Sequence, residues 1–377
     1  MTKYSKTLLM MAQGILLVSL PAIANDSENT TAQAKNTSVQ LSFGLGGLKA
    51  DSSLNKASVM GVNIGAKANH KITDSLAVDI AGGMNVQTGS STTARDNNIY
   101  KPGNSNYLKE AKLTYTPLSI LDLQAGVINQ SVLDAPLLVG NKGFIAAKEG
   151  FKYKVLDTKI SVFAMQAIPN NRNLSQRIDV EEDGDPRFFT ETVKVEQELF
   201  VGTFELGLTH FAFSDISNAV AYESILLGNT GSPIDNGNGV LTNEYQGWHI
   251  AAGYSANINE SINLTTKFNH LSNTAADADN TGYIAALGLN YTNNEKNYSV
   301  EIANFKIESD AAIAYYNSSK YGLANKQGNK LKLAYNNTES KLGASTEIIQ
   351  NKVIKNNLYQ ADETIFILSL RKLYDLF

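Results

Sequence analysis

The feature that most constrains the fold of this chain is a repeated alternation of apolar and polar residues. One example is the run WHIAAGYSANI, from Trp248 to Ile258, in which every even-numbered residue is apolar and every odd-numbered residue is small or polar. Successive side chains of a β-strand point to opposite faces. The spacing therefore predicts a strand with one apolar and one polar face.

Segments of this kind recur along nearly the whole chain. We place about sixteen of them, centred near residues 42, 63, 81, 112, 124, 149, 163, 194, 208, 253, 265, 287, 301, 333, 345 and 368. Short links alternate with long ones, and the long links cover residues 89–105, 130–142, 169–187, 214–245, 272–280, 309–327 and 351–362. Alternating link lengths are typical of up-and-down antiparallel strands that have short turns at one end of the sheet.

The residues on the polar face of each predicted strand indicate what the strands enclose. A soluble β-sandwich needs apolar residues facing its core, whereas here one face of each segment stays polar. Aromatic residues recur near strand ends on the apolar parity, as membrane-interface girdles do: Tyr115, Tyr153, Trp248, Tyr283, Tyr291, Tyr298 and Tyr335. We predict an all-β fold, a transmembrane antiparallel up-and-down β-barrel of about sixteen strands. A secreted all-β protein is the alternative.

The N-terminus has the pattern of an export signal. Lys3 and Lys6 precede an apolar run from Leu8 to Leu20, and a small-residue site ends at Ala24. This order predicts a signal peptide over residues 1–24 that is cleaved after Ala24; an uncleaved membrane anchor is the alternative. A short periplasmic segment, 25–37, and the barrel, 38–377, follow.

Composition excludes several functions. The formal net charge is −4 and the chain has no Cys, which argues against nucleic-acid binding and removes thiolate metal sites and Cys nucleophiles. Of the four His residues, His249 lies on the polar parity, but no Ser nearby stands in a nucleophile motif. We expect no enzyme activity, no cofactor and no metal.

The C-terminus reads FILSLRKLYDLF and ends on Phe377. With the export signal, the absence of Cys and the alternating strands, this end resembles the Gram-negative outer-membrane porin family. In that family the terminal aromatic is recognised by the barrel-assembly machinery, so the resemblance makes Tyr374 and Phe377 the assembly signal. Asp375 departs from the family, which usually has an aromatic there. The alternation also changes phase near Lys372, where a β-bulge would return both halves to the apolar face; the alternative is that Arg371 and Lys372 extend their charged ends to the periplasmic headgroups.

A barrel of about sixteen strands is wide enough for an aqueous channel. The link 131–142 is too apolar for a solvated loop, and porins fold their third loop into the pore. Its candidate constriction residues are Leu133, Asp134, Pro136, Leu137 and Lys142. The general porins' acidic loop motif is absent, and packing on the barrel end or on a neighbouring subunit is the alternative.

Charged residues on the polar parity are candidates to line the pore: Lys112, Lys148, Lys152, Lys154, Lys194, Glu196, Glu198, Asp79 and Asp122. The four lysines from 148 to 194 would form a basic wall or pair with Glu196 and Glu198. The acidic stretch 179–185 suits either a divalent cation or a solvated loop.

These observations predict an outer-membrane channel for passive diffusion of small hydrophilic solutes and ions. The expected partners are outer-membrane lipid and lipopolysaccharide, the barrel-assembly machinery and the solutes, with no nucleic acid; the resemblance implies a homotrimer. The alternatives are a substrate-specific channel, or a surface adhesin or receptor that uses the links 169–187 and 214–245.

Overall fold

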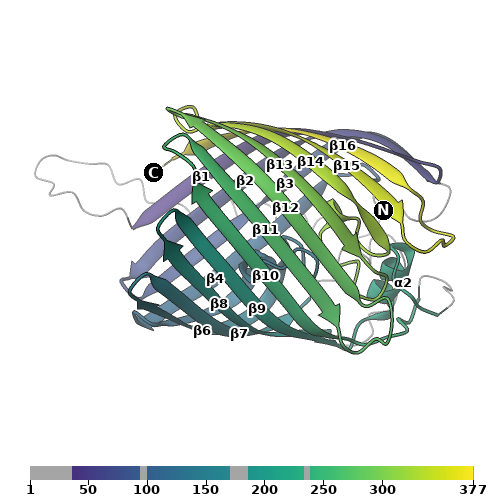
Figure 1. Cartoon of the computed structure of the whole chain (residues 1–377), viewed down its shortest axis with the longest axis horizontal. Helices are drawn as coiled ribbons and strands as arrows, with labels where there is room; N and C mark the ends of the chain where they lie inside the picture. Colours follow the sequence, from purple (N-terminus) through teal and green to yellow (C-terminus); the bar gives the residue numbers. More distant parts are fainter. Residues whose placement is uncertain (1–35, 94–99, 170–185, 233–237, 377) are drawn as a thin grey trace, which may run out of the picture. The chain divides into compact units, whose positions relative to one another are not determined.

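The chain forms one closed antiparallel β-barrel. The computed structural model describes residues 36–93, 100–169, 186–232 and 238–376, and these contain sixteen strands (Figure 1). Each strand pairs with its neighbours in sequence, and β1 pairs with β16 to close the sheet. The strands are β1 Thr37–Ser52, β2 Asn55–Thr73, β3 Leu76–Thr93, β4 Ser105–Leu118, β5 Leu121–Asn129, β6 Gly143–Val155, β7 Thr158–Ile168, β8 Arg187–Leu199, β9 Gly202–Ser214, β10 Tyr245–Asn257, β11 Ile262–Asn273, β12 Thr281–Asn293, β13 Lys296–Ile307, β14 Lys326–Asn337, β15 Leu342–Val353 and β16 Glu363–Asp375.

The predicted fold class is confirmed, and every predicted strand centre lies inside a strand. The predicted signal peptide lies outside the described residues. Among the described residues, no helix is long and apolar enough to cross a membrane.

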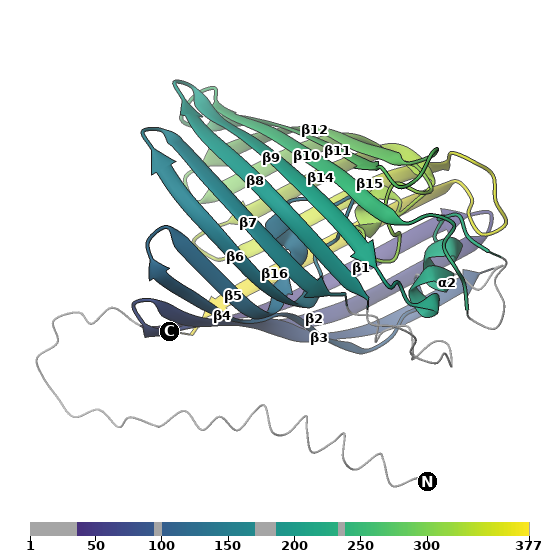
Figure 2. The same ribbon diagram turned by 90° about the horizontal axis from the view of Figure 1, so that it is seen from below.

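The two ends of the barrel differ. At the short-turn end, hairpins such as Asn293–Lys296 join the strands, and Asn294 takes a left-handed backbone conformation (φ 50°) that Asn tolerates in tight turns. The strand ends Thr37 and Asp375 lie at this end too. The longer connections and helix α2, Asn218–Leu226, gather at the opposite, long-loop end, on the right of Figure 1 and Figure 2.

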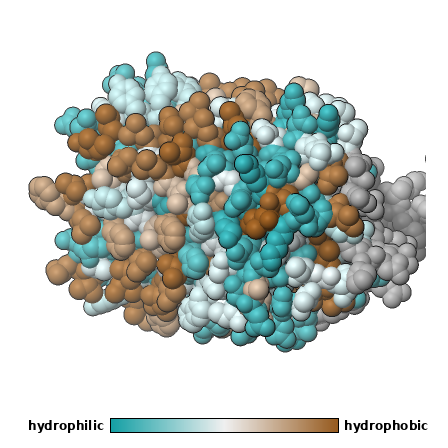
Figure 3. Space-filling model, turned by 45° about the vertical axis from the view of Figure 1, so that its right-hand side comes forward, coloured by the Kyte–Doolittle hydropathy of each residue, from teal (hydrophilic) through white to brown (hydrophobic). Residues whose placement is uncertain are grey.

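The outer wall is apolar. On β6, Ile145 and Phe151 are 62% and 56% exposed, whereas Phe144 and Lys148 on the other parity are buried inside the barrel. In Figure 3 apolar side chains cover much of the strand wall, while polar side chains dominate the long-loop end. A closed sheet leaves no unpaired strand edge, so an apolar wall of this kind can cross a lipid bilayer.

A girdle of tyrosines marks the short-turn end of the wall. Tyr291 and Tyr298 stack with ring centroids 6.3 Å apart, and Tyr335 lies 5.2 Å from Tyr298. Tyrosine suits the boundary between lipid and water because its ring is apolar and its hydroxyl is polar.

The predicted β-bulge in the last strand is wrong. β16 pairs with β1 without interruption from Glu363 to Asp375, so Tyr374 faces outward in phase with Leu370, and Leu373 faces inward. Lys372 can face outward without a bulge, because its ammonium extends to the carbonyl oxygen of Ser340 at the short-turn end. Phe377 lies outside the described residues.

The orientation of the barrel can be tested by cysteine labelling. Asn356→Cys at the long-loop end is expected to react with an impermeant maleimide on intact cells. Glu339→Cys, in a hairpin at the short-turn end, is expected to react only after the outer membrane is opened. Both positions are exposed, so reversed labelling would contradict a periplasmic position for the chain ends.

Candidate pore and constriction

The nine charged residues expected to line a pore all occupy inward-facing positions. Their parity is opposite to that of exposed wall residues such as Ile80, Leu113 and Tyr153. The register places Asp79 opposite Lys112, and their charged atoms lie 3.8 Å apart. Alternation along each strand is therefore enough to sort these side chains to the interior.

The inward charges form local pairs instead of the basic wall. Lys148 and Lys152 both approach Asp122, at 3.7 and 2.7 Å. Glu196 and Glu198 pair with Lys159, at 2.5 and 3.8 Å, a lysine that was not among the candidates. Both alternatives for the four lysines were therefore wrong: Asp122 on the neighbouring strand β5 supplies the partner of Lys148 and Lys152, and Lys159 supplies the partner of the two glutamates.

Two lysines differ from the others. Within the described residues Lys154 and Lys194 form no ion pair, and Lys194 Nζ donates instead to the carbonyl oxygen of Val132, at 2.8 Å. That contact joins the wall of β8 to the link between β5 and β6.

This link folds into the barrel. It begins with a short 3₁₀ helix, Gln130–Leu133, and Asp134 follows in a left-handed conformation (φ 53°). Leu133, Leu137 and Leu138 are at most 1% exposed, as expected for apolar side chains that need cover. The backbone of Ser318 donates to the carbonyl oxygen of Pro136, at 3.0 Å.

The second loop inside the barrel was not expected from the sequence. Residues 308–325 connect β13 to β14 and include the 3₁₀ helix Ser319–Tyr321. Residues Ala311 to Ala314 are fully buried, and Tyr316 stacks on the inward ring of Phe213 with centroids 5.6 Å apart. The apolar run AAIAYY within a predicted loop was the available signal, the same one that identified the link 131–142.

Residues 215–232, which contain α2, complete an inner loop cluster with residues 130–142 and 308–325. Asn229 fastens it: its amide donates to the carbonyl oxygen of Ala312 and accepts from the backbone of Ala314, each at 2.8 Å. Asn229 also donates to Tyr245 Oη on β10, at 3.1 Å. One buried side chain thus ties two loops to the wall.

Two cavities remain beside the inner loop cluster. One of about 340 Å³ lies between the link and strands β7 to β11, and its charged lining is Asp134, Lys159, Lys194, Glu196, Glu205 and Lys267. The other, of about 380 Å³, lies between the loops and the wall of β1, β2 and β14 to β16. Three lysines and three tyrosines are among the residues that line it: Lys142, Lys320, Lys326, Tyr100, Tyr315 and Tyr359.

Lys142 has an unusual environment at the second cavity. Its ammonium lies 4.5 Å from the ring centroid of Tyr315 and donates to the carbonyl oxygen of that residue. Burial lowers the pKa of Lys142 to about 8, because removing water disfavours the charged form.

The described residues contain no group of three His, Asp or Glu side chains arranged to hold a metal ion. His249 is fully buried, and its Nε2 lies 3.1 Å from Asn269 Oδ1, which suits a structural role. The acidic stretch 179–185 and most of the link 169–187 lie outside the described residues.

The pKa of Lys142 predicts pH-dependent ion selectivity. Raising the pH from about 6 to about 10 passes the pKa, so the side chain loses its positive charge and the ratio of anion to cation permeability is expected to fall. Glu223, Lys320 and Lys326 line the same cavity, so the change is partial. Reversal potentials in a salt gradient measure it.

Lys142→Arg is the matched control, because Arg stays charged throughout this range. This variant should keep the same ratio of anion to cation permeability on both sides of pH 8. Lys142→Met should show low anion preference at both pH values. An unchanged step in either variant would assign the titration to another group.

Comparison with known proteins identifies the fold. Neither a family model nor a curated protein matches the sequence. OprB of Pseudomonas putida matches in structure with a TM-score of 0.56 at 11% identity, over 90% of this chain and 94% of that chain. A loop L8 deletion mutant of OmpT, an outer membrane protein of Vibrio cholerae, matches with 0.53 at 9% identity, over 90% and 100%. The resemblance predicted from the sequence is confirmed for the architecture: the chain has the closed transmembrane β-barrel fold of these bacterial proteins.

Proposed function

We propose that this protein is an outer-membrane porin, a water-filled channel through which small hydrophilic solutes and ions diffuse passively. The observation that carries the proposal is the polar, charged inner face of a closed sixteen-strand barrel. Eight strands leave room only for side chains, whereas sixteen leave an aqueous channel. Diffusion down a gradient needs no cofactor and no catalytic group.

The inner loop cluster would set the size limit. Asp134 faces Lys159 and Lys194 across a cavity of about 340 Å³, and these residues form our candidate constriction. The carboxylates of Glu196 and Glu205 line the same cavity. Because positive and negative side chains both line this cavity, we expect the constriction to discriminate only weakly between anions and cations.

A substrate-specific channel is the second candidate. It is favoured by the cavity of about 380 Å³, where Lys142, Lys320 and Lys326 lie beside three tyrosines and outnumber the carboxylates of Glu223 and Glu363. A small anion with an apolar or aromatic part would suit this combination, since ammonium groups attract the charge and tyrosine rings cover the apolar part.

The remaining proposals concern the route to the membrane. Export would remove residues 1–24 after Ala24, and the barrel-assembly machinery would recognise the C-terminal aromatics and insert the barrel among outer-membrane lipid and lipopolysaccharide. We further propose a homo-oligomer, by resemblance a trimer, without enzyme activity.

Single-channel recording in planar bilayers tests the pore. Stepwise ohmic conductance is expected from the purified protein. Block by small anionic solutes, and not by neutral sugars of equal size, would favour the specific channel. A folded barrel that never conducts would contradict both and favour an adhesin or receptor.

A loop variant makes this test specific to the proposed constriction. Asn229→Ala removes the bonds that join its loop to residues 308–325 and to Tyr245 on β10, and it leaves buried carbonyl groups unpaired, at a cost of about 1–3 kcal/mol for each unpaired group. The variant should have a higher single-channel conductance than the wild type, and its current should fluctuate more. Asn356→Ala, at an exposed position, is the control, and equal conductance in both variants would place the constriction elsewhere.

Deleting Phe377 should lower the amount of folded barrel in the outer membrane without changing the conductance of the molecules that do assemble. Heat-modifiable mobility on gels measures the first quantity, and bilayer recording measures the second. Normal folded levels would contradict the role of the terminal residue in assembly.

A further inference from the structure

The cavity of about 340 Å³ beside the link between β5 and β6 is lined by charges of both signs that do not pair with one another. The inward carboxylates of the described strands have an ion pair or a hydrogen bond, with the exception of Glu205 on β9. Within the part of the chain that the structure describes, Lys267 on β11 and Asp134 on the link also form no ion pair. These three charges can therefore accept partners from outside the protein.

The sheet register spaces these charges across neighbouring strands. Glu205 pairs with Gly253, and Gly253 pairs with Lys267, so two strand spacings of about 4.8 Å separate the backbones of the two charged residues. On the other side, Lys194 of β8 pairs with Gly207, which lies two residues from Glu205 on β9. The carboxylate thus lies between two lysines without forming an ion pair with either.

Two glycines keep the space between these charges open. Gly207 and Gly253 both face inward, and neither takes a positive φ. A Cβ added at either position would come no closer than 3.7 Å to a residue on another strand, so neither the backbone conformation nor close packing requires glycine there. Their effect is to leave a floor without side chains, and a small solute can occupy that space.

The link holds its charge over this floor before any solute arrives. Lys194 Nζ donates to the carbonyl oxygen of Val132 at 2.8 Å, and the side chain of Leu133 is 1% exposed. Asp134 follows in a left-handed conformation, and its backbone N–H donates to the carbonyl oxygen of Ser131. A site whose groups are already in place loses little entropy on binding.

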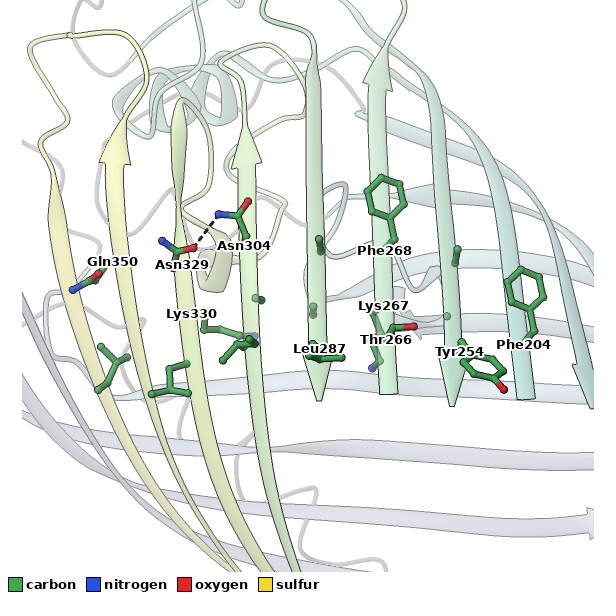
Figure 4. Close-up of a pocket in the computed structure, with 18 residues that line it drawn as sticks. Phe204, Tyr254, Thr266, Lys267, Phe268, Leu287, Asn304, Asn329, Lys330 and Gln350 are labelled. Atoms are coloured by element: carbon green, nitrogen blue, oxygen red, sulfur yellow. Dashed lines mark hydrogen bonds between the residues drawn. The ribbon is translucent and has the colours of Figure 1, made fainter. Parts of the chain in front are cut away.

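The outer side of the same strands is apolar. It carries a hollow of about 880 Å³ (Figure 4), where Phe268 and Leu287 face outward. Lys267 precedes Phe268 on β11 and has the opposite parity, so it faces the lumen. Its ammonium group is therefore accessible to solutes in the channel and not to lipid.

We propose that this cavity is a binding site for small amino acids in their zwitterionic form. The carboxylate of the solute would lie between Lys194 and Lys267, and its ammonium group would lie between Glu205 and Asp134. A simple anion would leave both carboxylates without a partner, and a simple cation would leave both lysines without one. A zwitterion complements both signs at once.

The size of the cavity agrees with this solute class. A volume of about 340 Å³ lies at the small end of the range for small-molecule sites. The inference rests on the proposed channel and names the solute class that its candidate constriction would prefer. It is compatible with weak discrimination between anions and cations, because an amino acid has no net charge.

Block of the channel current in planar bilayers tests the solute class. At neutral pH alanine carries both charges, whereas propionate carries only the carboxylate and ethylammonium only the ammonium group. Alanine should reach half block at a concentration about tenfold lower than either of the others, the factor expected for an additional charge-assisted hydrogen bond. Equal or stronger block by propionate or ethylammonium would overturn the proposal.

Two variants test the position of the site. Gly253→Val fills the floor without changing the charge, and Glu205→Gln removes the carboxylate with little change of shape; each should abolish the preference for alanine. Gly44→Val on β1 and Glu110→Gln on β4 are the matched controls, since both positions face inward outside the cavity. Heat-modifiable mobility checks that all four barrels are folded. A preference for alanine that survives Glu205→Gln would contradict the assignment.

A binding measurement separates this inference from the proposed channel. Saturation-transfer NMR of alanine with the detergent-solubilised barrel reports binding without any current, and ohmic current in salt alone reports the channel. A barrel that conducts but gives the same NMR signal with and without Glu205 would remove the site and leave the channel. A signal that depends on Glu205 in a barrel that never conducts would remove the channel and leave the site.

Discussion

The structure depends on the pairing of β1 with β16. Thirteen residue pairs, from Gln40 with Asp375 to Ser52 with Glu363, close the sheet, so no strand is left with a row of unpaired backbone groups. In lipid such a row would be prohibitively costly, because hydrocarbon offers no hydrogen bond. Closure also gives every strand one face toward the lumen and one toward the membrane. Residues that alternate along the sequence therefore face water and lipid in turn.

The interior shows how a wet barrel still contains an apolar core. Tyr316 packs against Phe144 and Phe213 of the wall, and Asn229 satisfies the backbone groups that this packing removes from water. Among the residues that the structure describes, this core surrounds the inner loop cluster. Elsewhere inward carboxylates and lysines pair across neighbouring strands, as Asp122 does with Lys152. The barrel is therefore narrowed by loops with a core of their own, and wall charges line the remaining space.

The sequence predicted the strands well because alternation is a local property, and it predicted inward positions for the same reason. It could not predict pairing. Lys159 pairs with Glu196 because β7 and β8 meet in one particular register, and no local pattern fixes that register. The inner position of residues 308–325 was missed, although their apolar run was visible. Glu149 on β6 was overlooked for a different reason: its outward position matters only once the apolar outer wall around it is known.

The seam between β1 and β16 also bears on how the chain folds. The side chain of Gln40 donates to Asp375 across 335 residues of sequence, so the last pairing closes the longest possible loop. The chain loses conformational entropy when its two ends come together, before any hydrogen bond between them forms. This loss makes closure slow for a chain that folds unaided. The inner loop cluster joins β5–β6, β9–β10 and β13–β14, hairpins spread around the sheet. Docking of these loops before closure would curve the open sheet and bring its edges together, so the elements that narrow the lumen would also shorten the search that completes the wall.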